Sequence, residues 1–344
     1  MDLLKEIRDK INSNPDRANS RGLKSVLTHI EIAERYYYRA KAERDEHLYT
    51  DVIYRTNHAF EGILKEAYST LAERSAERLS AASIEDYLLT TDTLRSRLTD
   101  LLTNYRKNWR NPSTHDHQLF FSEQESFLAI VTVSAFASIL LDRIIEKEAY
   151  KQKAEEFGRE ALRARDHITA FSTLAPIDKI TEILRSFGAY YLRHYENMSQ
   201  YPRGTANAQM AAFIEKVAPE IAVRIEHEFP ANDAVIRFDL LATVDGIDVG
   251  IETREPRRDH ESFSMDADTA ISQLAGHLKA AGLCNGVVFF YPGDPQHDIV
   301  TTTSSSSWPA SLKLREVFSD DPSLYADIPD QSPPADLVTD PQER

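Results

Sequence analysis

The chain has 344 residues and carries 40 Lys and Arg side chains against 55 Asp and Glu, a formal net charge of -15. Bulk charge of this sign excludes a protein that coats DNA or an anionic membrane, so any contact with nucleic acid must be a local patch. The length is comfortable for two domains. The single cysteine, Cys284, excludes an intramolecular disulfide framework and a four-cysteine zinc site, and we expect a cytoplasmic protein that makes no membrane contact.

Helical periodicity fills most of the first half of the chain, where apolar side chains recur every three or four residues. Ser122 and Glu125 match a capping box, which opens a helix just before the longest uncharged apolar run, Ser126 to Leu141. A bilayer span needs about 20 residues, so we predict that this shorter run is a buried core helix. We assign 1–175 to an all-α helical bundle.

The second half changes from a helical period to an alternating one. The elements predicted in chain order are helices at 177–200 and 207–218, strands at 235–241 and 247–253, a helix at 266–281 and a strand at 286–291. We therefore predict an α/β domain at 176–310. The remainder, 311–344, is acidic and Pro-rich, a composition typical of a mostly disordered tail.

A short polar segment, Trp109 to His117, follows one of the predicted helices of the first domain. Pro112 disfavours a helical conformation at Asn111, so we expect Arg110 in the last turn of a helix and His115 in the connection after it. An arginine and a histidine held at one helix junction, without a cluster of metal ligands, suit cleavage of RNA by internal attack.

Each residue type in this segment has a chemical role to offer. Histidine has a reference pKa near 6.5, so His115 can take the 2′-OH proton or supply a proton to the leaving oxygen. Arg110 can grip the phosphate with two hydrogen bonds, and Asn111 can hold either the phosphate or the imidazole. Arg106 and Lys107 add positive charge beside Arg110, and we predict that both contact RNA.

The segment resembles the signature of the HEPN family of small helical-bundle ribonucleases: an Arg, usually followed by a polar residue, then four to six residues and a His. Arg110, Asn111 and His115 occupy these positions with a spacer of four. The resemblance covers roughly 20–165 and implies that Arg110 and His115 are catalytic and that Asn111 supports them. An acidic or polar residue on an earlier helix often assists in the family, and Glu61 is the candidate here.

The resemblance also implies an assembly and a biological role. In the HEPN family two copies of the bundle pair so that their motifs form one composite, metal-independent site, which implies a homodimer or higher homo-oligomer. Proteins built this way resemble prokaryotic toxins and antiphage effectors, so RNA and a protein partner in a defence system are the expected partners. Two alternatives stay open: a helix C-terminus with its usual cation and a solvated histidine, or a metal held by His115-Asp116-His117.

An acidic hairpin is predicted in the second half. If Asp245-Gly246 forms a two-residue loop, the numbers of opposing residues add to 491, and Asp239 faces Glu252. Side chains that oppose one another in this way share one face of the sheet, with Cβ atoms about 4.5 to 5.5 Å apart. Two carboxylates at that separation can hold a single Mg²⁺ ion between them.

This arrangement resembles the restriction-endonuclease-like fold, PD-(D/E)xK, which has an Asp on one strand and Glu-x-Lys on the next. The match is Asp239 with Glu252-Thr253-Arg254, followed by the helix that carries Gln273 and the apolar strand 287–291. Arg254 stands where the family keeps a lysine, and an arginine is a poor proton-transfer group because it stays charged. The same register places Arg237 opposite Arg254.

Three functions therefore remain open on sequence grounds. The first is a metal-independent endoribonuclease whose second domain binds or senses nucleic acid or a partner. The second is a Mg²⁺-dependent DNA nuclease that uses Asp239 and Glu252, with Glu215 or Glu226 completing the metal site. The third is a non-catalytic partner-binding protein, in which the acids and arginines of the hairpin neutralise one another.

Overall fold

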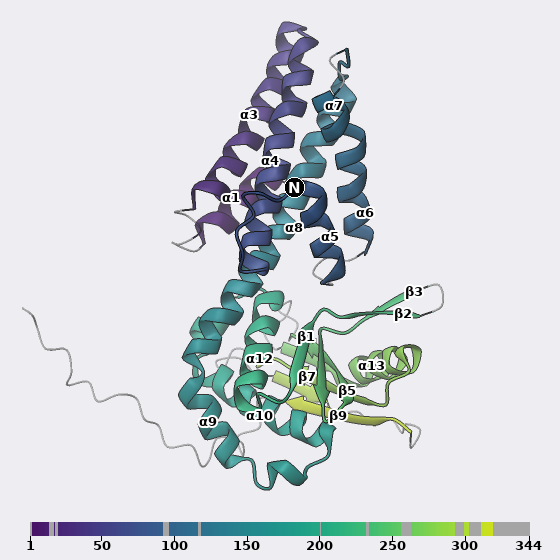
Figure 1. Cartoon of the computed structure of the whole chain (residues 1–344). Coiled ribbons are helices and arrows are strands. Elements are labelled where there is room, and N and C mark those ends of the chain that lie inside the picture. The colour runs from purple at the N-terminus through teal and green to yellow at the C-terminus, as the bar shows by residue number, and fades with distance from the viewer. Residues whose placement is uncertain are drawn as a thin grey trace, which may run out of the picture. The chain divides into compact units, whose positions relative to one another are not determined.

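A computed structural model describes most of the chain (Figure 1). The described residues are 2–13, 17, 20–91, 96–115, 118–199, 201–231, 234–255, 263–292, 299–302 and 311–318. The chain divides into two compact units, one of Met1–Glu156 with Arg203–Gln209 and the other of Phe157–Pro202 with Met210–Arg344. The first division therefore comes at residue 156, earlier than the boundary at 175 that the sequence predicted.

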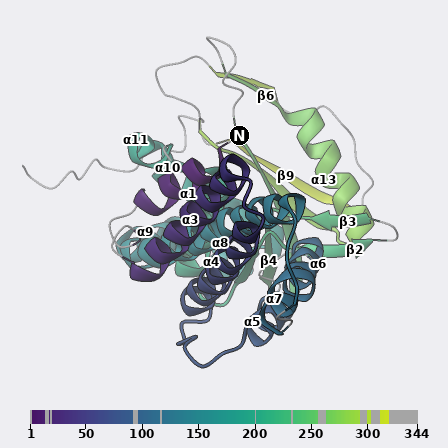
Figure 2. The ribbon, with the colours of Figure 1, turned by 90° about the horizontal axis from the view of Figure 1, so that it is seen from above.

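The first unit is a helical bundle. Its elements are α1 (Leu3–Asn12), α3 (Arg21–Glu43), α4 (His47–Leu71), α5 (Ala81–Thr90), α6 (Ser96–Tyr105), the π-helical turn η1 (Arg106–Arg110), α7 (Asn111–His115) and α8 (Glu123–Glu156). Helices α3 and α4 run side by side as a long antiparallel pair, and α8 packs against both (Figures 1 and 2). The core between them contains fully buried side chains such as Phe60, Ile63, Val133 and Leu140.

Local capping explains where several of these helices begin. Ser20 accepts a hydrogen bond from the Leu23 N–H at 3.3 Å and opens α3. The predicted capping box at α8 is confirmed, because the Ser122 hydroxyl accepts from the Glu125 N–H at 3.3 Å and a Glu125 carboxylate oxygen accepts from the Ser122 N–H at 2.8 Å. Each cap satisfies N–H groups that have no partner inside the helix.

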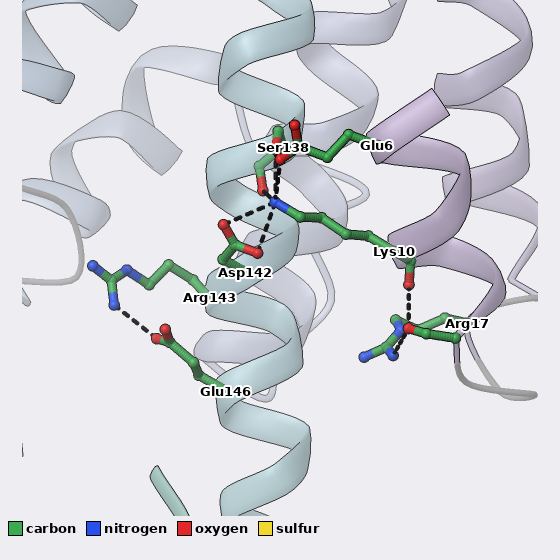
Figure 3. Close-up of polar contacts among 8 residues, drawn as sticks. Glu6, Lys10, Arg17, Ser138, Asp142, Arg143 and Glu146 are labelled. Carbon is green, nitrogen blue, oxygen red and sulfur yellow. Dashed lines mark hydrogen bonds and ion pairs between the residues drawn. The ribbon is translucent and has the colours of Figure 1, made fainter. Parts of the chain in front are cut away.

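A polar cluster ties the short helix α1 to the middle of α8. Figure 3 shows Lys10 reaching from α1 to Ser138 and Asp142, with Glu6 beside it. The Lys10 Nζ lies 2.7 Å from Ser138 Oγ and 2.9 Å from both Asp142 Oδ1 and Glu6 Oε1. The hydrogen bond from Lys10 lowers the pKa of Glu6. These contacts fix α1 at the end of the chain onto the longest helix of the bundle.

Helix α8 holds the long apolar run. Among the described residues it is the one helix with the length and composition to cross a membrane, with an 18-residue window of mean hydropathy 2.0, of which 56% is buried inside the structure. A core helix of a soluble protein has the same properties, and Ala129, Val133, Ala137 and Leu141 lie in the core at helical spacing. The prediction of a buried core helix is therefore confirmed.

The second unit combines helices with a mixed sheet. Its helices are α9 (Gly158–His167), the 3-10 turn η2 (Phe171–Thr173), α10 (Pro176–Arg193), α11 (Tyr195–Met198), the latter part of α12 (Arg203–Val217) and α13 (Ala267–Ala281). Its strands are β1 (Ala222–Ile225), β2 (Glu228–Ala231), β3 (Ala234–Arg237), β4 (Leu240–Val244), β5 (Ile247–Arg254), β6 (Phe263–Asp266), β7 (Asn285–Phe290), β8 (Ile299–Thr302) and β9 (Lys313–Phe318). The predicted α/β character of this half is confirmed.

Five of these strands form one sheet in the order β1-β4-β5-β7-β9. The β1–β4 and β4–β5 pairs are antiparallel, whereas β5–β7 and β7–β9 are parallel, with α13 as the crossover between β5 and β7. Val288 and Phe290 pack with α13 in one core cluster, while the intervening Phe289 lies 5.9 Å, ring to ring, from Phe187 of α10. Helices α13 and α10 therefore cover opposite faces, which explains the continuous apolar run in β7.

Two predictions about strands were wrong. The single strand predicted at 235–241 is split, because β3 leaves the main sheet to pair with β2, and β4 starts anew at Leu240. Glu226, between β1 and β2, has a φ of 52°, so the backbone adopts a left-handed conformation where β1 ends. The predicted tail at 311–344 began too early, since β9 adds a parallel strand to the edge of the sheet beyond residue 310.

Candidate active site

The Arg-Asn-Pro-Ser-Thr-His segment adopts helical structure instead of ending a helix. The π-helical turn η1 precedes α7, and the Asn111 N–H donates to the Arg106 carbonyl five residues back. Pro112 has no N–H, and in an α-helix its ring would clash with the carbonyl of Asn108. The wider π turn relieves this conflict, so the helix continues to His115. The expectation that His115 lies in a connection was therefore wrong.

Arg110 is held from two sides. Its Nε donates to Glu61 Oε1 at 2.8 Å and its Nη2 lies 2.7 Å from the same oxygen. Its Nη1 donates to Asn111 Oδ1 at 3.1 Å. The Arg110 side chain is 29% exposed, so the guanidinium is oriented by the protein while part of it still faces solvent. Both supporting residues proposed from the sequence, Asn111 and Glu61, contact Arg110 directly.

A buried polar network fixes the backbone of this turn. Tyr105 Oη lies 2.9 Å from Thr56 Oγ1 and 3.0 Å from Asn57 Oδ1. Asn57 Nδ2 donates to Ser113 Oγ at 2.7 Å, and the Ser113 hydroxyl donates to the Arg110 carbonyl at 2.9 Å. Burial raises the pKa of Tyr105, which keeps the phenol protonated. Side chains of α4 thus hold both the backbone of the motif and the Arg110 side chain.

Arg106 is bound to a buried carboxylate of α5. Its Nε lies 2.9 Å from each carboxylate oxygen of Glu85 on α5, and Glu85 is only 3% exposed. A carboxylate at this depth needs a partner of opposite charge, so Arg106 serves to neutralise it. The Arg106 side chain remains 21% exposed, and its contact with RNA stays a prediction. Lys107, the other predicted RNA-binding residue, is exposed to solvent.

The structure describes only part of the segment from His115 to His117. His115 is the last residue of α7, on the same helical stretch as Arg110, and its side chain lies outside the described part of the structure. Asp116 and His117 lie outside it altogether. Within the described residues there is no group of three or more His, Cys, Asp or Glu side chains suited to a metal ion. The metal alternative at His115-Asp116-His117 therefore stays a prediction.

The acidic hairpin of the second unit has the predicted register. The β4–β5 pairs run from Leu240↔Ile251 to Val244↔Ile247, which confirms the turn at Asp245-Gly246. Asp239 and Glu252, just beyond the last of these pairs, are 6% and 5% exposed. Burial and the nearby charge of Asp239 raise the pKa of Glu252. The two carboxyl groups are thus near one another, in line with the predicted register, and both are buried, which the sequence did not predict.

The protein itself supplies partners for both carboxyl groups. Asp239 Oδ2 accepts from the Thr253 N–H at 2.8 Å and from the Thr253 hydroxyl at 3.0 Å. Glu252 Oε1 lies 2.9 Å from His277 Nδ1, and Glu252 Oε2 lies 3.2 Å from Arg254 Nη1. Arg254 also donates to Gln273 on α13 at 2.8 Å. A Mg²⁺ ion would have to compete with a guanidinium and an imidazole for the same oxygens.

The candidates for a third metal ligand point elsewhere. Glu215 Oε1 accepts from the Val223 N–H at 2.9 Å, and Glu226 pairs with Arg237 at 2.8 Å. Arg237 belongs to β3 and pairs there with Glu228, so the prediction that it faces Arg254 was wrong. The donor set, with these carboxylates already bound by other groups of the protein, therefore does not fit a Mg²⁺ ion.

Sequence reasoning missed four of these participants. Glu85 and Asn57 lie far from the motif in sequence, and no spacing rule connects either of them, or the Tyr105 hydroxyl that binds Asn57, to it. His277 lies four residues after Gln273 on α13, so both project from one face of the helix that follows the Glu252 strand. That spacing was a usable signal for His277.

No family model matches this chain, and no curated protein or solved structure matches it either.

Proposed function

We propose that the chain is a metal-independent endoribonuclease of the HEPN type, with Arg110 and His115 as its catalytic residues. The observation that carries the proposal is the clamp of Glu61 and Asn111 on the Arg110 guanidinium. An arginine bound by a carboxylate on one edge keeps a fixed orientation, and this orientation favours two-pronged binding of a phosphate. Fixed donors aimed at developing charge are the main source of electrostatic catalysis.

In the proposed reaction, the ribose 2′-OH attacks the adjacent phosphate and the downstream RNA is released. His115 takes the proton of the 2′-OH or gives one to the departing oxygen, and a paired histidine from a second copy performs the other transfer. The 2′-oxygen forms a bond to phosphorus as the bond from phosphorus to the 5′-oxygen breaks. The products are a 2′,3′-cyclic phosphate and a 5′-hydroxyl, and Arg110 stabilises the extra negative charge on the phosphate during the exchange.

A homodimer is part of the proposal. Several large apolar side chains that follow the motif in sequence are exposed in the single chain: Phe120 at 63%, Phe127 at 54%, Leu128 at 48% and Val131 at 38%. The last three lie on α8 at spacings of one, three and four residues, so they occupy adjacent positions on that helix. Exposed apolar groups of this size favour contact with another protein surface. We propose that a second copy of the chain covers these side chains. We also propose that the protein is cytoplasmic.

For the second unit we propose binding in place of cleavage. The strand directions and the α13 crossover support a restriction-endonuclease-like domain, with Arg254 in the position of the usual lysine. Internal pairing of Glu252 with His277 and Arg254 supports a domain that binds or senses nucleic acid or a protein partner. We further propose a role as a toxin or antiphage effector, in line with the proposed fold and activity.

The test uses the full-length protein and total RNA in a buffer with EDTA. We expect RNA fragments from the wild type and none above background from the Arg110→Ala and His115→Ala variants. Arg78→Ala, at an exposed position of the same unit, is the matched control and should cut as the wild type does. Cleavage that EDTA abolishes, and that survives in Arg110→Ala, would support a Mg²⁺-dependent nuclease; identical RNA profiles for all variants and buffer would support a non-catalytic binding protein.

A further inference from the structure

The second unit contains a cavity of about 530 Å³ between α9 and α10. The α9 residues that line it include Glu160, Arg163 and His167, which are spaced by three and four residues and so share one face of the helix. Phe213 of α12 also lines the cavity. Ligand pockets in proteins usually have volumes of roughly 300 to 1,000 Å³, so the space suits a small organic molecule.

Positive charge prevails in the lining. Three arginines, Arg163, Arg185 and Arg193, face the cavity with two glutamates, Glu160 and Glu182. The balance is therefore one positive charge, before any protonation of His167. Since the whole chain has a formal charge of -15, this local excess of arginine runs against the general composition.

Two of the arginines converge from different helices onto one point. Arg163 Nη1 of α9 lies 3.0 Å from Glu160 Oε1, and Arg193 Nη2 of α10 lies 3.2 Å from Glu160 Oε2. The Glu160 carboxylate thus occupies the position of an anion held between two guanidinium groups. A phosphate group, with three acceptor oxygens, can take the same donors.

The existing ion pairs are weak enough to be exchanged. The side chains of Arg163 and Arg185 are 49% and 44% exposed, and Arg185 meets Glu182 at 2.8 Å on the same helix. Pairs this exposed contribute little to stability because water screens them. A ligand that carries two or more negative charges can therefore compete with a single carboxylate for these guanidiniums.

The lining of the cavity also contains small and aromatic side chains. Tyr190 and Phe213 contribute rings, with centroids 6.3 Å apart and planes inclined by 30°. Ala164 and Ala189 leave room beside them, and Ser186 and Thr169 add hydroxyl groups to the lining. A ligand with an anionic group and a flat ring matches this lining. The anionic group can bind the arginines, and the ring can pack between the small and aromatic side chains.

We propose that this cavity binds a nucleoside phosphate, with the phosphates between Arg163, Arg185 and Arg193 and the base against Tyr190 and Phe213. The site lies in the second unit and does not depend on the ribonuclease activity proposed for the first. Neither the Arg110 motif nor the Asp239 hairpin contributes a residue to it.

Isothermal titration calorimetry of the full-length protein tests the proposal. The probes are ADP, GDP, CDP and UDP, with adenosine and inorganic pyrophosphate as separate arms. We expect saturable binding of at least one nucleoside diphosphate, and weaker binding of both adenosine and pyrophosphate. Arg163→Gln and Arg193→Gln should each weaken the binding about tenfold, because each removes a charge-assisted hydrogen bond to phosphate. Glu160→Gln should tighten it, because the competing carboxylate is lost.

Arg159→Gln is the matched control: it changes an exposed arginine of α9 that does not line the cavity, and it should bind as the wild type does. Circular dichroism of each variant shows whether the helices remain folded. The proposal is overturned if no nucleoside diphosphate binds at millimolar concentration, if Arg159→Gln weakens binding as much as Arg163→Gln, or if Glu160→Gln weakens it. Pyrophosphate that binds as tightly as every nucleoside diphosphate contradicts a base-binding site.

Discussion

Arg110 on the π-helical turn and Glu61 on α4 form an ion pair at 2.7 Å, across 49 residues of sequence. The contact joins the arginine of the Arg-Asn-Pro-Ser-Thr-His motif to the central helix of the bundle. Because Asn111 binds the same guanidinium from its other edge, the side chain has one preferred direction. In our account this orientation distinguishes a phosphate clamp from the ordinary cation at a helix C-terminus.

The first prediction concerns Glu61 as a positioning residue. Glu61→Ala should lower the single-turnover rate of RNA cleavage by about 10- to 100-fold, because a misplaced catalytic group costs roughly this much. Glu61→Gln keeps an acceptor oxygen and should recover part of the rate. The affinity for RNA should change little in either variant. Glu77→Ala, at an exposed position of the same unit, is the control, and an unchanged rate in Glu61→Ala would contradict the clamp.

The second prediction concerns Arg106. Arg106→Ala should destabilise the helical unit by about 3 kcal/mol, since it leaves the buried Glu85 carboxylate without its counter-ion. The double variant Arg106→Met with Glu85→Leu should be more stable than the single variant, because no unpaired charge remains. Urea denaturation followed by circular dichroism measures both. Unchanged stability in Arg106→Ala, together with a full loss of RNA binding, would contradict this role and assign Arg106 to RNA contact alone.

The third prediction concerns the π-helical turn. Pro112→Ala supplies the missing N–H and removes the ring clash, so the segment can return to regular α-helix. That change would rotate Arg110 relative to Glu61. We expect the melting temperature to stay the same or rise while cleavage falls about tenfold or more. Parallel loss of stability and activity would mean that Pro112 serves the fold alone.

The fourth prediction concerns pH and two stacked histidines. His29 of α3 and His58 of α4 lie with ring centroids 5.0 Å apart and planes inclined by 17°. Burial, and then repulsion from His58 and Arg55, lowers the pKa of His29 below its usual 6.5. The unfolded chain therefore takes up the proton first, so the free energy of unfolding falls as pH drops below about 6.5 toward the lowered pKa.

Hydrogen exchange of α3 and α4 measures this effect. Between pH 7.5 and 5.5, protection of their amides should fall in the wild type, after correction for intrinsic exchange. His29→Gln should reduce this fall, whereas the control His47→Gln, at an exposed position, should leave it as it is. Equal pH dependence in the wild type and His29→Gln would contradict the role of His29, and protection that rises as pH falls would contradict the predicted sign.

Several parts of the structure could be predicted from local sequence alone. The capping box at Ser122 and Glu125 and the two-residue turn at Asp245-Gly246 each depend on residues within a few positions of one another. The turn fixes the register of β4 and β5, and the register brings Asp239 near Glu252. The position of the hairpin site could therefore be predicted from local sequence, without knowledge of the rest of the fold.

Contacts between distant segments could not be obtained in this way. The pairing of Arg106 with Glu85 and of Arg110 with Glu61 depends on which helices pack together, and nearby arginines on one helix turned out to have different partners. The π-helical turn is a second example. Pro112 normally indicates the end of a helix, but a change in hydrogen-bond pattern over one turn allowed the helix to continue.

One measurement tests the central claim most directly. A short end-labelled RNA that contains the preferred cleavage site is incubated with the protein in EDTA, beside the same RNA with a single 2′-deoxynucleotide immediately before the scissile phosphate. We predict that the first RNA is cut to leave a 2′,3′-cyclic phosphate, that the second is not cut at that position, and that Arg110→Ala cuts neither. Cleavage of the 2′-deoxy substrate, or cleavage that requires Mg²⁺ and persists in Arg110→Ala, would contradict internal attack at an Arg110 and His115 site.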